Sequence, residues 1–269
     1  MMNTSYPTSQ IWAGTLLIAG SIILPFIFKA FQKKSHLTPE KTERLQHRAW
    51  SNRALATLLI IWISLYLLAA GIGSFFYEDQ LPPVRLILTY IMYILIGAYI
   101  IHTQQTHSSA QSFGLAKENL SQLRWAIPLY LAFLPLLGLV AILNQLFFNK
   151  LLHIEIEHQA ITQYMNQLNK PLHQIYIATA IFIAPLYEEI LFRGILLPKI
   201  TQKTGLTNAL IITSLLFAAL HFHLPALLPL FALSTLLSLV YWWSGSLWNC
   251  IAIHMIFNAG SIAFLIASK

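Results

Sequence analysis

The sequence predicts an all-α protein built as a polytopic membrane helix bundle of about eight transmembrane helices. Hydrophobic residues make up 57% of the chain and charged residues only 9%, whereas soluble domains carry roughly one quarter charged residues. The apolar residues come mostly in blocks of 18 or more, close to the length that a helix needs to cross a hydrocarbon core of about 30 Å. Blocks of this length are typical of spanning helices rather than of barrel strands.

The expected spans can be read in chain order from the apolar blocks. The first two flank a strongly basic stretch, the fifth contains an acidic pair, and the sixth and eighth contain histidines. The N-terminal segment MMNTSYPTSQ lacks the basic start of a cleaved secretory signal, so we expect the first helix to be retained. The eight expected spans are 11–29, 54–76, 84–101, 125–148, 172–197, 206–222, 225–243 and 247–266.

The distribution of Lys and Arg between the loops predicts the orientation, because positively charged loops tend to remain cytoplasmic. One side of the predicted membrane carries eleven basic residues and the other carries four, which predicts that both termini lie outside. The eleven are Lys29, Lys33, Lys34, Lys41, Arg44, Arg48, Arg53, Lys117, Arg124, Lys199 and Lys203; the four are Arg85, Lys150, Lys170 and Lys269.

The net charge of +7 does not indicate a nucleic-acid-binding protein. The excess is concentrated in the loop that follows the first span, where orientation and contact with anionic lipids explain it. No RNA- or DNA-binding pattern accompanies this charge, so we expect the lipid bilayer, and not a nucleic acid, as a partner. The single cysteine, Cys250, cannot form an internal disulfide.

The fifth span contains the stretch IFIAPLYEEILFRGILL, which places charge inside apolar sequence. A charged side chain at the centre of a spanning helix costs about 2.5–3.5 kcal/mol on insertion scales. Glu189 and Arg193 are four residues apart and can pair on one helix face, which neutralises both. Glu188 points about 100° away and requires another partner, water or a proton.

Two later spans supply polar groups for Glu188. His254 and Asn258 are four residues apart and share a face, and His221 follows Phe217 by four residues. A lone intramembrane His or Asn is more often a packing contact than a catalytic group. A glutamate, two histidines and an asparagine together instead predict a hydrolytic site, in which the glutamate takes a proton from water and the donors stabilise an oxyanion.

Three short motifs carry a resemblance to a known family. EEILFR matches EExxxR, FAALH matches FxxxH and HMIFN matches HxxxN, in the order found in the CPBP family. That family contains the type II CAAX prenyl endopeptidases, the Rce1-like proteases and bacterial relatives linked to bacteriocin maturation or self-immunity. The motifs span residues 188–258, and the wider resemblance covers about 115–266.

The resemblance implies an intramembrane endopeptidase with no required cofactor. In it Glu188 activates water with help from His221, and His254 and Asn258 form the oxyanion hole. Glu189, Arg193 and Phe217 are then supporting residues. A zinc metalloprotease is the alternative: the chain lacks the HExxH motif, but Glu188, His221 and His254 offer a possible ligand set.

The resemblance also leads to expectations about domains, substrate and location. We expect N-terminal transmembrane helices of unassigned role in residues 1–110 and a CPBP-like protease core in residues 111–269. We expect a peptide or membrane-protein substrate and a location in the bacterial cytoplasmic membrane. Two other classes remain as alternatives, a non-catalytic scaffold or bacteriocin immunity protein and a membrane transporter.

Overall fold

The computed structural model describes residues 18, 20–26, 29, 38–73, 75, 81–106, 113–115, 117–153 and 170–267. Every regular element in these residues is a helix, which confirms the predicted all-α class. Within this part of the chain, six helical segments are long and apolar enough to cross a membrane: Asn52–Ile72, Pro83–Thr103, Leu120–Lys150, Pro171–Thr204, Leu224–Ser244 and Leu247–Ile266. The protein is an integral membrane protein that crosses the bilayer several times.

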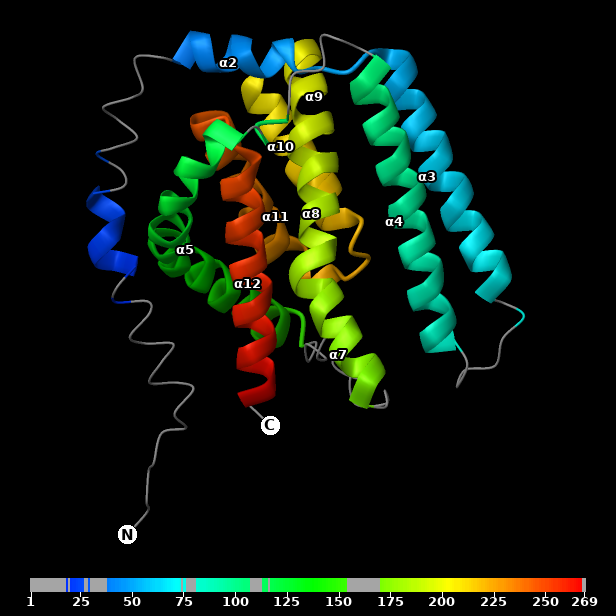
Figure 1. The fold of residues 1–269 in the computed structure, drawn as a ribbon. Helices are drawn as coiled ribbons and strands as arrows, with labels where there is room; N and C mark the ends of the chain where they lie inside the picture. Colours follow the sequence, from blue (N-terminus) through cyan, green and yellow to red (C-terminus); the bar gives the residue numbers. More distant parts are fainter. Residues whose placement is uncertain are drawn as a thin grey trace.

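The first two of these segments form a hairpin. Helices α3 (Asn52–Gly73) and α4 (Leu81–Thr106) pack against each other along their length, and the Tyr99 hydroxyl donates a hydrogen bond to the Ala54 carbonyl at 3.0 Å. Figure 1 shows α4 between α3 and the remaining helices. The hairpin therefore presents α4, not α3, to the rest of the molecule.

The remaining helices pack around one long helical segment, which we call the site helix (residues 170–204). It comprises α7 (Lys170–Ala178), α8 (Ala184–Glu189) and α9 (Leu197–Thr204), joined by π-helical turns. Helices α5 (Ala126–Leu146) and α12 (Leu247–Ala267) lie on one side of the site helix and α4 on the other (Figure 1). Helix α11 (Leu227–Ser244) contacts both α5 and α12 through fully buried residues such as Leu237 and Val240.

Two of the eight expected spans differ from the structure or lie outside it. Most of the first expected span, 11–29, lies outside the described residues, although residues 20–26 are helical. The expected span 206–222 contains only the 14-residue helix α10 (Leu206–Ala219). A helix of that length extends about 21 Å, which is less than the hydrocarbon thickness of about 30 Å. His221 consequently lies on a turn beyond the helix end, and Phe222 next to it has a φ of 50°.

Helix α2 (Thr38–His47) lies in a stretch for which the sequence predicted only a polar connection. It crosses the ends of α9 and α11 (Figure 1) and is held there by its basic side chains. Arg44 donates to the Trp242 carbonyl at 3.0 Å, and Arg48, directly after the end of α2, donates to the Tyr241 hydroxyl at 2.9 Å. A Cβ at Gly245, where φ is 70°, would lie 2.6 Å from Cζ of Arg44, so this close approach requires glycine.

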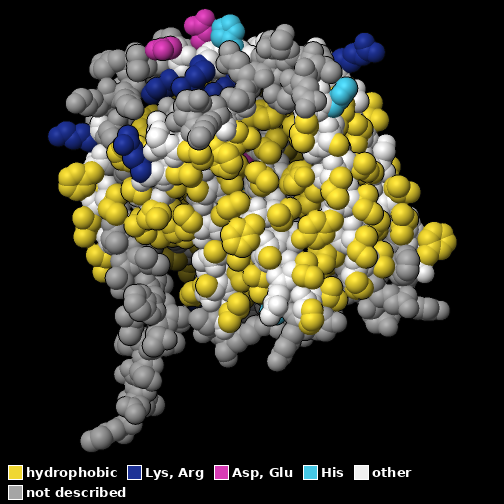
Figure 2. All heavy atoms as spheres, in the orientation of Figure 1, with side chains coloured by type: hydrophobic (Ala, Val, Ile, Leu, Met, Phe, Trp, Pro, Cys, Tyr) yellow, Lys and Arg dark blue, Asp and Glu magenta, His cyan; other side chains and the backbone are white. Residues whose placement is uncertain are grey.

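The surface matches a bilayer environment. Hydrophobic side chains cover the face shown in Figure 2, whereas Lys and Arg side chains gather at the end where α2 lies. Among the exposed apolar residues are Ile60 of α3, Ile94 of α4 and Leu139 of α5, each at least half exposed. Side chains of this kind belong in contact with lipid, because spanning helices need no polar outer face.

Candidate active site

The acidic pair lies where the site helix changes its winding. Residues 179–183 and 190–196 are π-helical, and α8 between them ends at Glu189. Pro185 occupies the first turn of α8, where its missing N–H does not interrupt the hydrogen-bond ladder of that short α-helix. Single π-helical turns are rare and occur frequently at functional sites. The π-helical turns therefore flank the same short segment, α8, in which the sequence places Glu188 and Glu189.

Glu189 and Arg193 form a buried ion pair, which confirms the pairing predicted from their spacing. Nη1 of Arg193 lies 2.8 Å from Oε1 of Glu189, and both side chains are fully buried. Nη2 of Arg193 also donates to the carbonyl and hydroxyl oxygens of Ser234 on α11, at 3.0 and 2.8 Å. The guanidinium lies over the Phe217 ring at 4.9 Å from its centroid. Arg193 thereby connects the site helix to α11 and α10.

Glu189 has a second partner, which the sequence analysis did not predict. Nδ1 of His254 lies 2.8 Å from the same Oε1 atom of Glu189. A carboxylate only accepts hydrogen bonds, so Nδ1 of His254 carries a proton and donates it. These two residues are 65 positions apart. No spacing rule within one helix connects them, and only the packing of α12 against α8 brings them together.

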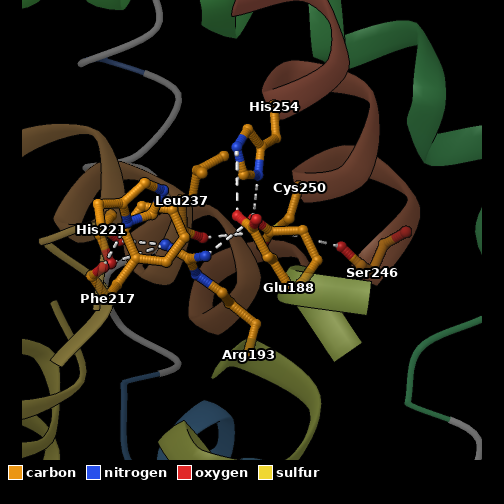
Figure 3. A network of polar contacts seen from close by, with 10 residues as sticks. Glu188, Arg193, Phe217, His221, Leu237, Ser246, Cys250 and His254 are labelled. Atoms are coloured by element: carbon orange, nitrogen blue, oxygen red, sulfur yellow. Dashed lines mark hydrogen bonds and ion pairs between the residues drawn. The ribbon is translucent and has the colours of Figure 1, made fainter. Parts of the chain in front are cut away.

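His254 also lies next to Glu188, as predicted. Its Nε2 atom is 3.8 Å from Oε2 of Glu188, so each nitrogen of the imidazole faces a different glutamate. Figure 3 shows the His254 ring directed toward Glu188. The Glu188 side chain is 29% exposed, whereas those of Glu189 and Arg193 are fully buried. Glu188 is therefore the acidic side chain of this pair that a water molecule or a substrate can reach.

His221 joins this group through an aromatic ring. Its Nδ1 atom lies 2.7 Å from the Phe217 carbonyl, and the two rings are 4.8 Å apart. The Phe217 ring also contacts His254, at a distance of 5.8 Å between ring centroids, so Phe217 packs against both histidines. In the part of the chain that the structure describes, no hydrogen bond or ion pair joins His221 to Glu188 directly. Because Nδ1 is bonded to a carbonyl, Nε2 is the ring nitrogen of His221 that could bind a water or a substrate.

Asn258 lies one turn after His254 on α12. Its side-chain amide bonds to the backbone of the site helix at Ala180, which precedes Glu188 by eight residues. Nδ2 donates to the Ala180 carbonyl at 2.9 Å. An amide nitrogen carries two hydrogens, so one N–H remains for another acceptor. The structure therefore shows Asn258 as a contact between α12 and the site helix.

The proposed zinc ligands do not form a ligand set in this arrangement. Nδ1 of His254 is bonded to Glu189 and Nδ1 of His221 to a backbone carbonyl, which leaves Nε2 of each ring as the atom that could bind a metal. Among the described residues, no group of three or more His, Cys, Asp or Glu side chains is close enough to hold a metal ion.

Comparison with known proteins identifies the segment that carries this geometry. Residues 171–260 match the family model described as "Type II CAAX prenyl endopeptidase Rce1-like". We call residues 171–260 the Rce1-like domain, after the family to which this segment is similar. No curated protein and no solved structure gives a significant match to the chain.

The Rce1-like domain contains all three motifs seen in the sequence. Its boundaries include the site helix from Pro171 onward and α12 as far as Gly260, and thus every side chain in the polar group described above. Helices α2, α3, α4 and α5 lie outside the matched residues. The match confirms the resemblance to the CPBP family, which includes membrane proteases, over residues 171–260.

Proposed function

We propose that the protein is an intramembrane endopeptidase in which Glu188 activates the attacking water. The observation that supports this assignment most strongly is that His254 contacts Glu189 through Nδ1 and approaches Glu188 through Nε2. A general base must lie within reach of the proton that it removes, and an oxyanion needs a fixed donor close to that base. Glu188 and His254, 3.8 Å apart, meet both requirements in one place.

The charges of the group support a protonated His254. Two carboxylates and one guanidinium, from Glu188, Glu189 and Arg193, sum to one negative charge inside the membrane. A protonated imidazole brings the sum to zero, which lowers the cost of burying the group. In that form Nδ1 donates to Glu189 and Nε2 directs a second N–H toward the space beside Glu188.

Hydrolysis then proceeds through these atoms. Glu188 takes a proton from water as the oxygen attacks the peptide carbonyl, and the carbonyl oxygen becomes negatively charged. The Nε2–H of His254 and the free N–H of Asn258 donate to that oxygen. The tetrahedral intermediate then collapses: the C–N bond breaks as Glu188 returns the proton to the leaving amine, which gives a carboxyl and an amine terminus. Nε2 of His221 assists Glu188 in holding the water.

The substrate and the catalytic type can be tested together by reconstituting the full chain in liposomes with a peptide library. The library contains prenylated and unprenylated C-terminal peptides and apolar spanning peptides. We expect cleavage that persists in excess chelator, with less than stoichiometric zinc in active protein by mass spectrometry. One zinc per chain, together with turnover that chelation abolishes and zinc restores, would instead establish a metalloprotease.

The end of the molecule that carries α2 is proposed to face the cytoplasm of a bacterial cell. Its basic side chains, shown in Figure 2, support this orientation by the positive-inside tendency. In a Cys250→Ala background, we expect Phe75→Cys, at an 86% exposed position, to react with a membrane-impermeant thiol reagent in intact spheroplasts. Gln202→Cys on α9 should react only after lysis. The reverse labelling pattern would invert the topology.

A further inference from the structure

Helix α4, which lies outside the Rce1-like domain, contacts the site helix along one face. Tyr90, Tyr93 and Gly97 are separated by three and four positions, so they lie on the same side of α4. The Tyr90 hydroxyl is 2.7 Å from Oγ1 of Thr179, a residue in the first π-helical turn. A Cβ at Gly97 would lie 2.9 Å from the Tyr187 hydroxyl, so the absence of a side chain there permits the approach.

The central contact of this face lies beside the proposed general base. The rings of Tyr93 and Tyr187 are stacked, with centroids 4.4 Å apart and planes inclined by 17°. Tyr187 immediately precedes Glu188 in the chain, so the stacked Tyr93 ring contacts the neighbour of the proposed base on the site helix. Tyr93 thus links α4 to the residue that precedes the proposed base.

The hydroxyl groups of the two α4 tyrosines differ in their bonding. The Tyr90 hydroxyl bonds to Thr179, whereas the Tyr93 hydroxyl has no hydrogen-bond partner among the described residues. Tyrosine hydroxyls that are shielded from solvent usually find a partner. An ordered water typically makes about three hydrogen bonds, so a water held by Glu188 needs further partners nearby.

We propose that Tyr93 is a positioning residue whose hydroxyl helps to hold the attacking water beside Glu188, so that α4 forms one wall of the active site. The proposal rests on the proposed function of Glu188. It assigns a role to the N-terminal helices in residues 1–110, because the ring stack on Tyr187 fixes the position of that hydroxyl. The protease core alone, on this proposal, has an incomplete site.

The test compares Tyr93→Phe with Tyr90→Phe in the reconstituted full chain. The substrate is the peptide that the wild type cleaves fastest in the library assay. Tyr93→Phe keeps the ring stack and removes only the hydroxyl, so we expect kcat to decrease about tenfold, with KM and the unfolding temperature unchanged. Tyr90→Phe removes a bond to Thr179, so the unfolding temperature should decrease while kcat remains at the wild-type value.

The two variants and Glu188→Gln separate the possible outcomes. If Glu188→Gln is inactive but Tyr93→Phe retains the wild-type kcat, the positioning role is wrong and the proposed function stands. If both tyrosine variants lower kcat equally, α4 acts only through packing, which also contradicts the positioning role. If Glu188→Gln cleaves normally, the proposed function and this inference are both wrong.

Discussion

Replacing Glu188 with glutamine is expected to lower the rate of peptide cleavage by a factor of about 10² to 10⁴, the usual effect of removing a general base. Glutamine has nearly the volume of glutamate and can fill the same space beside His254. Because Glu188 is part-exposed and its nearest ionic partner is 3.8 Å away, the substitution removes no short buried ion pair. The unfolding temperature should therefore remain close to that of the wild type.

The matched control for this substitution is Glu43→Gln. Glu43 lies on α2, its side chain is 71% exposed, and it has an exposed ionic neighbour, His47, at 3.6 Å. The same chemical change there should leave both cleavage and stability unaltered, since exposed pairs contribute little. Equal cleavage by wild type and Glu188→Gln would refute the assignment of Glu188 as the base.

A related variant tests the oxyanion role of His254. Removing one oxyanion donor typically lowers kcat by a factor of about 10² to 10³. We expect His254→Ala to reach that range, and added zinc should not restore the rate. Recovery of the rate by zinc or by other ligand side chains would favour metal coordination at this position.

Replacing Arg193 with methionine is expected to reduce the free energy of unfolding by about 3–5 kcal/mol, because it leaves a buried carboxylate without its ionic partner. Arg193 is fully buried, and the substitution removes its contacts with Glu189, with both oxygens of Ser234 and with the Phe217 ring. Thermal unfolding of the purified protein in detergent measures the effect. The exposed Arg53→Met serves as control, with an expected change within about 0.5 kcal/mol.

The double substitution Glu189→Leu with Arg193→Met separates charge from packing. Removing both charges should restore part of the stability that Arg193→Met loses, since replacing a whole buried pair by apolar residues is often nearly neutral. Cleavage by the double variant should be slower than by the wild type, because Nδ1 of His254 loses its acceptor on Glu189. A double variant less stable than the single one would contradict the ion-pair explanation.

The sequence alone determined the features that depend on local regularities. Apolar blocks predicted the spanning helices, since a backbone in hydrocarbon must satisfy its own hydrogen bonds. The four-residue spacing predicted the Glu189–Arg193 pair, which the structure shows at 2.8 Å. The motifs at 188–193, 217–221 and 254–258 also predicted the family that residues 171–260 match.

The tertiary structure alone decided which groups meet between helices. It joined His254 to Glu189, placed His221 on a turn beyond the short helix α10, and brought Tyr93 of α4 against Tyr187. It also showed α2 as a helix held by Arg44 and Arg48. These contacts depend on the rotation, tilt and depth of each helix relative to its neighbours. Spacing along one chain segment sets which residues share a face of a helix, but the packing of all the helices sets what that face touches.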